Sequence, residues 1–212
     1  MRNFLVAAGL CALSAALSLA PAAGEGATLA GLQQWLDGTK DLQARFEQSL
    51  LSSALGAGPS ESGRVYLRRP GRMRWEYTQP ESKIAVLVDD RTQLYLAAEK
   101  RLHVAQLSKD DAPLAALLAG TQPLSAVFEA TSLPDEGGKG RIKLVPKSPT
   151  SGVQEIVLGL DPKTSAVLRV EVLDQGGNRM GYTFSALKRN AGVADSLFRL
   201  DPPRGTEVVE GL

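Results

Sequence analysis

Most of the chain alternates apolar and polar side chains at every second position. Leu42, Ala44 and Phe46 each stand between polar neighbours, and Val65 and Leu67 stand between arginines and a tyrosine. A period of two is typical of a β-strand that buries one face. Clusters of glycine, proline and aspartate separate these runs and mark turns. The pattern therefore predicts a chain that is mainly β.

The short spacing between strand candidates indicates how they connect. Turn signals such as Gly137-Gly138-Lys139-Gly140 join neighbouring runs as tight hairpins. Ten or eleven strands joined in this way predict one antiparallel meander that curls into a barrel or half-barrel. The strand candidates are residues 42–47, 64–68, 72–77, 84–88, 93–97, 101–107, 127–133, 141–145, 153–160, 166–173 and 179–187.

Two segments depart from the strand pattern and predict short helices. In the first, Thr28 is placed to cap a helix that Gly38 ends. The second, residues 113–119, is apolar on every side and, at roughly 12 Å, is far too short to cross a membrane. Two interpretations fit such a helix. It is either a short buried core helix or a lid over a hydrophobic cavity in the barrel mouth.

Residues 1–22 have the features of a cleaved signal peptide. A short positive start precedes an apolar run, and Ala20-Pro21-Ala22 fits the cleavage rule. The only cysteine, Cys11, follows Leu10 inside this run, whereas a lipidated cysteine needs a small residue before it. We therefore expect an exported, cysteine-free and non-lipidated product that forms a single domain over residues 23–212.

Composition excludes several classes of function. With 24 basic and 23 acidic residues, the chain lacks the basic excess of a nucleic-acid binder. One histidine, His103, and no hydrolase, zinc or nucleotide-binding motif leave little for catalysis. We expect neither a metal nor a cofactor, and no catalytic residues.

A basic cluster interleaved with aromatic residues is the most distinctive local feature. It is compatible with the solvated faces of two strands or with a surface for an anionic partner. A platform for single-stranded nucleic acid is disfavoured because the chain is expected to be exported and has no charge excess. The basic residues are Arg64, Arg68, Arg69, Arg72 and Arg74, and the interleaved ones are Tyr66, Met73, Trp75 and Tyr77.

Several of these stretches together resemble the periplasmic outer-membrane lipoprotein carrier family, which has the LolA/LolB-type fold. The most specific is an Arg-Arg-Pro block that runs from Gly63 through Arg69 to Trp75. The supporting stretches follow in the family's order and span the expected mature chain almost end to end. They are residues 42–48, 144–147, 181–184 and 198–205.

The resemblance implies a mainly β fold with short helices, a half-open antiparallel β-barrel closed by a helical lid over a hydrophobic cavity. It also implies a periplasmic carrier that binds lipoprotein acyl chains. The carrier would accept its cargo from an inner-membrane ABC lipoprotein-releasing complex and pass it to an outer-membrane receptor lipoprotein. Such a carrier is not an enzyme, and we expect it to be a monomer.

By the same resemblance, individual residues acquire expected roles. Arg69 matches the arginine that holds the lid shut through hydrogen bonds to helix carbonyls. Strand alternation places Arg69 on the apolar side with Leu67 and leaves Arg68 on the polar side. The expected cavity residues are Met73, Trp75, Tyr77, Phe46 and Leu67, and the expected lid residues are Leu114, Leu117 and Leu118.

Other functions remain compatible with the residues alone. The same fold would serve a periplasmic lipid or glycolipid shuttle, or a module of an envelope sensor. An enzyme in a lipocalin-like barrel is a further alternative. A receptor of the same fold is disfavoured because it would need a lipidated cysteine at its mature N-terminus.

Overall fold

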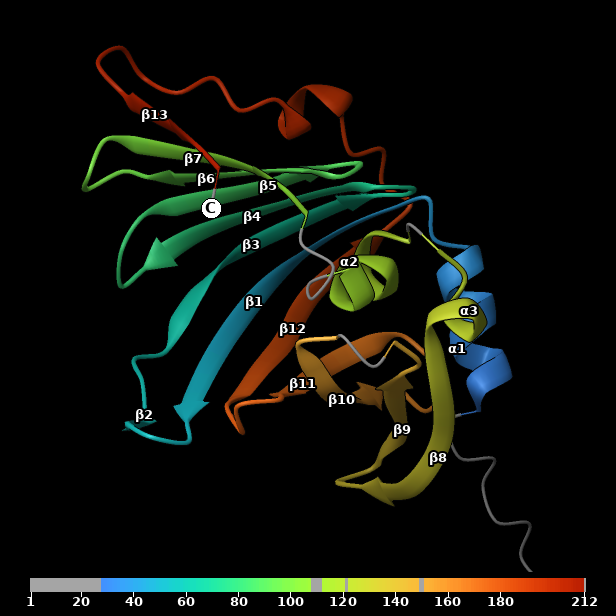
Figure 1. The fold of residues 1–212 in the computed structure, drawn as a ribbon. Coiled ribbons are helices and arrows are strands. Elements are labelled where there is room, and N and C mark those ends of the chain that lie inside the picture. Colours follow the sequence, from blue (N-terminus) through green and yellow to red (C-terminus); the bar gives the residue numbers. More distant parts are fainter. Residues whose placement is uncertain (1–27, 108–111, 121, 149–150, 212) are drawn as a thin grey trace, which may run out of the picture.

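One continuous curved sheet forms most of the molecule, and helices lie within its curve and at one end (Figure 1). The computed structural model describes residues 28–107, 112–120, 122–148 and 151–211. The expected signal peptide therefore lies outside the described residues. Among those that are described, no helix is long and apolar enough to span a membrane.

The elements follow one another in the order that Figure 1 labels. The strands are β1 Asp41–Ser52, β2 Gly56–Ala57, β3 Glu61–Arg68, β4 Arg72–Gln79, β5 Lys83–Val88, β6 Arg91–Leu96, β7 Arg101–Gln106, β8 Phe128–Glu136, β9 Lys139–Pro146, β10 Val153–Leu160, β11 Val167–Asp174, β12 Arg179–Arg189 and β13 Glu207–Glu210. The helices are α1 Leu29–Asp37, α2 Ala112–Ala119, α3 Leu124–Val127 and a 3₁₀ turn, η1, at Asp195–Phe198.

The sheet confirms a mainly β chain, but the expectation of one antiparallel meander is wrong. The strand order is β13-β7-β6-β5-β4-β3-β1-β12-β11-β10-β9-β8, so two meanders meet where β1 pairs with β12. The segment that carries α2 and α3 takes the chain from β7 to β8, which is the strand at the opposite edge of the sheet. In addition, β13 pairs with β7 in parallel. Residues 190–206 lead from β12 to β13, which lies at the far edge of the other meander.

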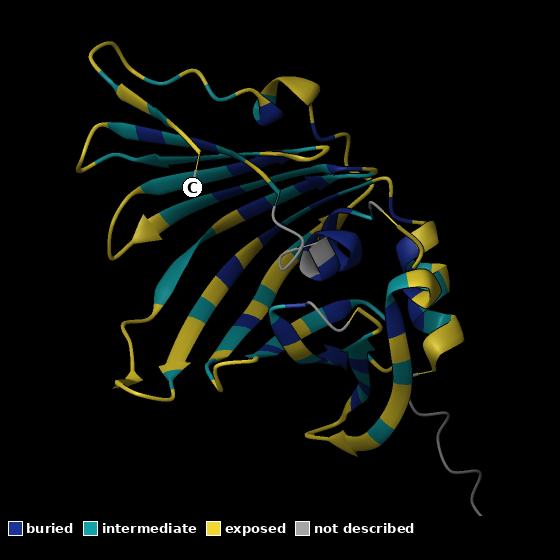
Figure 2. Cartoon of the chain, in the orientation of Figure 1, coloured by how far each residue is buried: buried dark blue, intermediate teal, exposed yellow. Residues whose placement is uncertain are grey.

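The predicted alternation decides which side chains face the inside of the curve. Cross-strand pairing aligns Leu42 with Leu67 and Leu67 with Met73. In the next row along the same two strands, Val65 on β3 is aligned with Trp75 on β4. Leu42, Leu67, Val65 and Trp75 are all buried, and the burial colouring of Figure 2 shows the same alternation along the strands. The inner face of β1, β3 and β4 is therefore an apolar surface whose register is fixed by backbone pairing.

The signals for the first helix are confirmed at both ends. The side chain of Thr28 accepts a hydrogen bond from the Gly31 amide at 3.0 Å. Gly38 caps the other end and donates to the carbonyl of Gln34. Leu32 and Leu36 form the buried face of the helix.

A glycine allows an aromatic ring to lie directly on the inner face of β3. Phe46 on β1 pairs with Gly63, and its ring is buried there. A Cβ atom on Gly63 would lie 1.9 Å from the Glu76 carbonyl oxygen and 3.0 Å from the Phe46 ring. Only glycine permits both the strand spacing and the position of the ring.

We therefore expect Gly63→Ala to lower the free energy of unfolding by about 1–3 kcal/mol, because the backbone of β4 and the ring of Phe46 must both shift. Urea unfolding monitored by circular dichroism measures this loss. Gly58→Ala is the matched control, since the nearest atom to its Cβ would be 3.6 Å away. Equal stabilities of the two variants would contradict the close approach at Gly63.

Candidate functional site

Helix α2 is buried on every side that the structure describes. Ala115, Ala116, Leu117 and Ala119 are at most 3% exposed, and Leu118 is 9% exposed. The helix packs against β3, β4 and α3 and lies within the curve of the sheet (Figure 1). The side chain of Leu114, one of the expected lid residues, lies outside the described residues. An apolar helix thus occupies the space that the inner faces of the strands enclose.

The turn between β3 and β4 binds the C-terminal end of α2. Arg69 donates hydrogen bonds to the carbonyl oxygens of Leu117 at 2.7 Å and Leu118 at 3.4 Å. The Gly71 amide donates to the carbonyl oxygen of Ala119 at 2.9 Å. The last carbonyls of a helix have no partner within the helix. Here a single β-turn supplies partners for three of them.

Arg69 also joins α2 to α1. Its Nη1 donates to the carbonyl oxygen of Leu36, in the last turn of α1, at 3.3 Å. The guanidinium therefore lies between the C-terminal ends of two helices, each of which carries partial negative charge. Burial lowers the pKa of Arg69, while the negative charge of Asp37 acts in the opposite direction. An arginine suits this place because it stays protonated even when it is largely removed from water.

Gly120 lets α2 end against this arginine. Its φ angle is +67°, a left-handed conformation typical of the residue after a helix, and its amide donates to the carbonyl of Ala116. A Cβ at this position would lie 3.1 Å from the guanidinium carbon of Arg69. The predicted end of this helix at residue 119 is confirmed, and the glycine that follows leaves room for the arginine as well.

An aromatic cluster continues the inner face beyond α2. The Phe46 ring lies 4.7 Å from that of Trp75 and 4.9 Å from that of Tyr77, in both cases edge to face. From β12, Tyr182 lies 5.2 Å and Phe184 6.1 Å from Trp75. Rings from β1, β4 and β12 therefore meet across the junction of the two meanders. Such aromatic pairs stabilise the fold by more than the burial of their apolar area alone would.

Polar atoms at the edge of this cluster are paired. The Tyr77 hydroxyl lies 2.9 Å from Gln48 Oε1, and the Lys83 ammonium lies 4.3 Å from the centre of the Tyr77 ring. Burial raises the pKa of Tyr182 to about 12, and the charge of Glu61 adds to the effect. Burial also raises the pKa of Tyr77 well above its ordinary value, as do the charges of Tyr182 and Glu61.

A small cavity of about 30 Å³ remains where α2 meets the sheet. A cavity of this size holds a few water molecules at most. Apolar side chains from α1, α2 and five strands line it. The lining residues are Trp35, Leu36, Thr39, Leu42, Val65, Leu67, Arg69, Trp75, Leu117, Leu118, Val167 and Phe184.

The structure divides the expected site residues into two groups. Leu67, Trp75, Leu117 and Leu118 line the small cavity with Arg69. The other three lie next to it: Phe46 and Tyr77 in the aromatic cluster, and Met73 against Leu87, Ala115 and Ala119.

Sequence reasoning missed Tyr182, Phe184, Trp35 and Val167. Phe184 pairs with Phe46 across β1 and β12. The alternation within residues 179–187 would have placed Phe184 and Tyr182 on one face. Only the long-range pairing shows that this face meets the face of Phe46.

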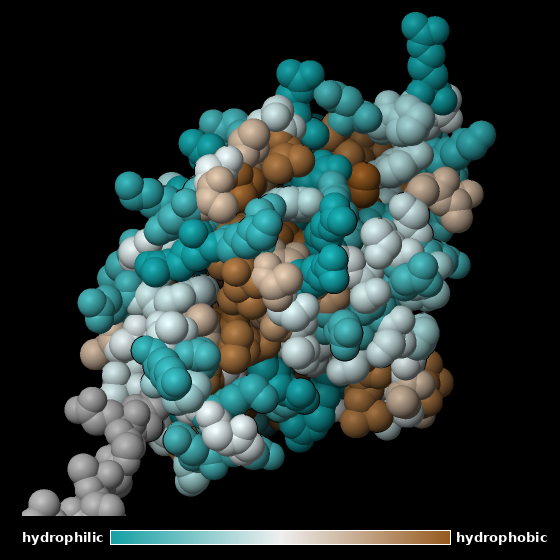
Figure 3. Space-filling view, turned by 180° about the vertical axis from the view of Figure 1, so that it is seen from behind, coloured by the Kyte–Doolittle hydropathy of each residue, from teal (hydrophilic) through white to brown (hydrophobic). Residues whose placement is uncertain are grey.

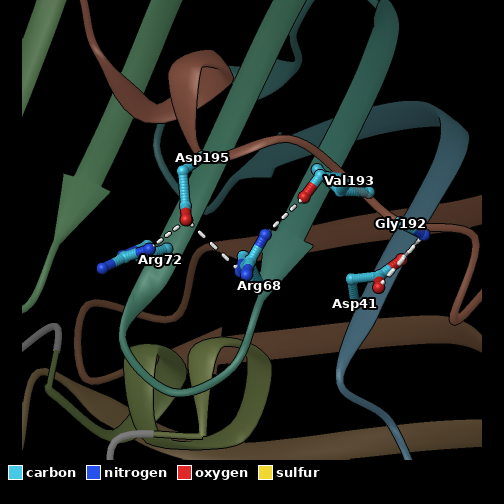
Figure 4. Close-up of polar contacts among 6 residues, drawn as sticks. All are labelled: Asp41, Arg68, Arg72, Gly192, Val193 and Asp195. Atoms are coloured by element: carbon cyan, nitrogen blue, oxygen red, sulfur yellow. Dashed lines mark hydrogen bonds and ion pairs between the residues drawn. The ribbon is translucent and has the colours of Figure 1, made fainter.

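Most of the basic cluster binds the C-terminal segment on the opposite side of the sheet (Figure 4). Arg68 donates to the Val193 carbonyl at 2.8 Å and lies 3.3 Å from the Asp195 carboxylate, with which Arg72 also pairs. Arg74 donates to another carbonyl of this segment. These three arginines have partners within the chain, so the hypothesis of a free surface for an anionic partner loses most of its residues.

Groups suited to bind a metal are not found together in the described part of the chain. No three His, Cys, Asp or Glu side chains there are close enough to hold an ion. The site is instead an apolar helix on an apolar surface, with one half-buried cation, Arg69, at the helix end.

Comparison with known proteins assigns this arrangement to a family. The family model for the outer membrane lipoprotein carrier protein LolA matches residues 37–201, which include β1, the Arg69 turn and α2. The chain belongs to the LolA family. The family description names an outer membrane lipoprotein carrier rather than a catalyst.

Relatives in the LolA family match nearly the whole chain. An outer-membrane lipoprotein carrier protein of Chromobacterium violaceum is 28% identical over 205 residues, which cover 95% of this chain and 96% of that protein. One of Methylobacillus flagellatus is 30% identical over 180 residues, covering 84% and 86%. The fold is similar to that of an uncharacterized conserved protein from Thermus thermophilus, with a TM-score of 0.53, 16% identity and coverage of 86% and 96%.

The raised tyrosine pKa values predict a loss of stability in alkali. Above about pH 10 the unfolded chain loses both phenolic protons while folded Tyr77 and Tyr182 keep theirs. The free energy of unfolding should therefore fall by about 1.4 kcal/mol per pH unit for each tyrosine. Urea unfolding between pH 9 and 11.5 measures the slope.

The double variant Tyr77→Phe/Tyr182→Phe should show a shallower slope, because neither ring then carries a proton to lose. Phe46→Leu serves as the control, since it loosens the same cluster without removing a titrating group. It should lower stability at every pH and leave the slope as in the wild type. A double variant with the wild-type slope would contradict the burial of the two hydroxyls.

Proposed function

We propose that the protein carries lipoproteins through the periplasm by binding their acyl chains in the space that α2 now fills. The observation that carries the proposal is the position of α2, an apolar helix inside an apolar curved sheet, held at its end by the Arg69 turn. In this arrangement the helix covers the binding surface of the empty carrier. Membership of the LolA family supports the same role.

The size of the remaining cavity implies that α2 has to move. A space of about 30 Å³ holds a few water molecules at most and is far too small for a lipoprotein's acyl chains. Leu117 and Leu118 already contact the surface that an acyl chain would use. Cargo and helix therefore compete for one apolar surface, and binding of the cargo displaces α2.

This competition solves an energetic problem of any lipid shuttle. Burying hydrocarbon is worth about 0.8 kcal/mol per CH₂ group. About two dozen buried groups would then reach the affinity of the tightest non-covalent complexes known, roughly 18–21 kcal/mol. Cargo held that tightly would not be released. A helix that gains its own apolar burial and hydrogen bonds on closing offsets part of this energy and favours release.

The Arg69 turn sets the size of that offset. Closing α2 regains two hydrogen bonds from Arg69 and one from the Gly71 amide. Opening leaves a guanidinium that water can solvate again. Arg69 acts in this proposal as a latch whose strength tunes the balance between holding and releasing the cargo.

The direction of transport follows from the partners that the family role requires. An inner-membrane ABC lipoprotein-releasing complex supplies the cargo, and an outer-membrane receptor lipoprotein accepts it. The carrier itself needs export, which a signal peptide at residues 1–22 would provide, and it acts as a monomer without a cofactor.

Removal of the latch tests the proposal. Arg69→Leu should keep the fold but weaken the closed form by about 2–3 kcal/mol, the loss expected for hydrogen bonds from a charged donor. The variant should bind a fluorescent fatty acid at least tenfold more tightly than the wild type and release it more slowly to a competing acceptor. Titration and stopped-flow fluorescence measure both quantities.

Two further variants make the test specific. Arg68→Leu removes a neighbouring arginine that contacts Val193 and Asp195 on the opposite face, so acyl-chain binding should stay as in the wild type. Arg69→Lys should be intermediate, since an ammonium lacks the planar fork of donors. If Arg68→Leu changed binding as much as Arg69→Leu, the latch would be wrong. If the wild type bound no fatty acid, the proposed function itself would fail.

A further inference from the structure

Arg64 is the one member of the basic cluster that binds neither helix α2 nor the C-terminal segment. Its side chain is exposed on the outer face of β3, the face opposite α2. Within the described residues it forms no hydrogen bond or ion pair. Exposed charges are ordinary in themselves, and Figure 3 shows hydrophilic side chains over much of one face of the molecule. Arg64 is informative because of the groups that surround it.

Two further cations share this outer face with Arg64. Arg45 on β1 is aligned directly opposite Arg64, and Lys188 on β12 is aligned with Gln43 of β1. Both are exposed, and neither forms an ion pair in the part of the chain that the structure describes. Like charges directly opposite one another in antiparallel strands are destabilising. An anion bound between these cations would relieve that repulsion.

A groove of about 280 Å³ lies between the three cations. The rest of its lining is neutral and comes from Gln43, Ala44, Tyr66 and Ala186. No carboxylate is among the described residues that line it. We call this space and its lining the basic groove.

A β-bulge in β12 gives the basic groove its third cation. The pairing of β1 with β12 shifts by one residue between Gln43 and Arg45. Before the bulge Phe184 packs against the core, and after it Leu187 does. Uninterrupted alternation would have turned Lys188 to the same side as Phe184. The bulge therefore places Lys188 on the outer face.

The backbone at the bulge is itself unusual. Ala186 has a φ angle of +50°, a left-handed conformation that is uncommon for alanine. Residues held in such conformations concentrate at functional sites. The short side chain of Ala186 also leaves the groove open, because it is one of the residues that line it.

Carboxylates on the same face do not neutralise the basic groove. Glu76, opposite Arg64 on β4, pairs with Arg74 at 2.7 Å. Asp41 accepts hydrogen bonds from backbone amides of the C-terminal segment. Glu47 is exposed two residues beyond Arg45, but it does not line the groove and forms no ion pair within the described residues. The three cations therefore remain available to an anion from outside.

The shape and charge of the groove favour an acidic segment of a protein as the ligand. A single small anion among exposed side chains is held weakly, because water and salt screen each charge. A chain that carries several carboxylates gains by binding all of them at once, and guanidinium groups bind carboxylates through two parallel hydrogen bonds. A bilayer surface is flat and does not enter a recess between strands.

We propose that the basic groove docks an extended acidic segment of a partner protein. The groove and α2 lie on opposite sides of the sheet, so a partner bound in the groove leaves the inner face free. This inference goes beyond the proposed function, because docking on the outer face requires no cargo.

Fluorescence anisotropy with a dye-labelled oligoglutamate peptide tests the docking. The wild type should bind the peptide at low salt and lose it as salt is raised. Arg45→Gln/Arg64→Gln/Lys188→Gln should bind at least about tenfold more weakly, the factor expected when three exposed ion pairs are lost. The matched control is Lys100→Gln/Lys163→Gln/Arg204→Gln, which removes three exposed cations outside the groove and should bind as the wild type does.

A variant of unchanged charge separates the groove from general attraction. In Ala186→Leu a larger side chain fills the recess while every cation stays in place. Peptide binding should weaken about tenfold, because the carboxylates no longer reach all three cations. Circular dichroism spectra that match the wild type check that each variant is folded. Binding as in the wild type by folded Ala186→Leu would overturn the groove.

Other outcomes would overturn the inference as well. Equal weakening in the triple variant and its control would show attraction by net charge alone. Displacement of the labelled peptide by inorganic phosphate as readily as by unlabelled peptide would show a site for small anions. Binding to phosphatidylglycerol vesicles that the triple variant loses, without binding of the peptide, would show a membrane contact.

Binding of a fluorescent fatty acid separates this inference from the proposed function. The triple variant should bind the fatty acid as the wild type does, because its three side chains lie on the outer face. A wild type that bound no fatty acid would overturn the proposed function, and peptide binding would still decide on the groove.

Discussion

An apolar helix cannot remain in water, and the rest of this structure depends on how that constraint is met. Helix α2 has no polar face to turn outward, so the curved sheet has to cover it. The sheet in turn has an apolar inner face that needs cover, and α2 supplies it. Each apolar surface thus shields the other from water in the empty protein. In the proposed function, a ligand with enough hydrocarbon takes the place of α2.

The β3–β4 turn connects this exchange to the rest of the fold. Towards the inside, Arg69 and Gly71 bind the last carbonyls of α2. Towards the outside, Arg68 and Arg72 flank the same turn and bind the segment around Asp195 (Figure 4). The outer contacts hold the turn against the C-terminal segment, so in the proposed function the inner contacts would break and form at a defined place. A short turn with basic residues on both faces thus holds α2 and the C-terminal segment together.

Local features of this fold could be predicted from the sequence, whereas long-range pairing could not. The cap at Thr28, the helix end at Gly120 and the alternation of β1 and β3 each depend on residues within one element. The opposite directions of Arg68 and Arg69 follow from the same alternation. The pairing of β1 with β12, and the parallel return of β13 to β7, depend on segments more than 100 residues apart. Tyr182 and Phe184 escaped prediction for that reason, since their own strand does not show which strand lies beside it.

The central claim is that α2 and acyl chains occupy the same surface in turn. Hydrogen exchange of backbone amides, measured with and without a bound saturated fatty acid, tests it most directly. The amide of Gly71, which donates to Ala119, reports on the closed helix. We expect binding to speed exchange at Gly71 and in α2 while β10 and β11 stay protected. Equal or greater protection of Gly71 and α2 in the bound protein would show that cargo binds without displacing the helix, and would contradict the account.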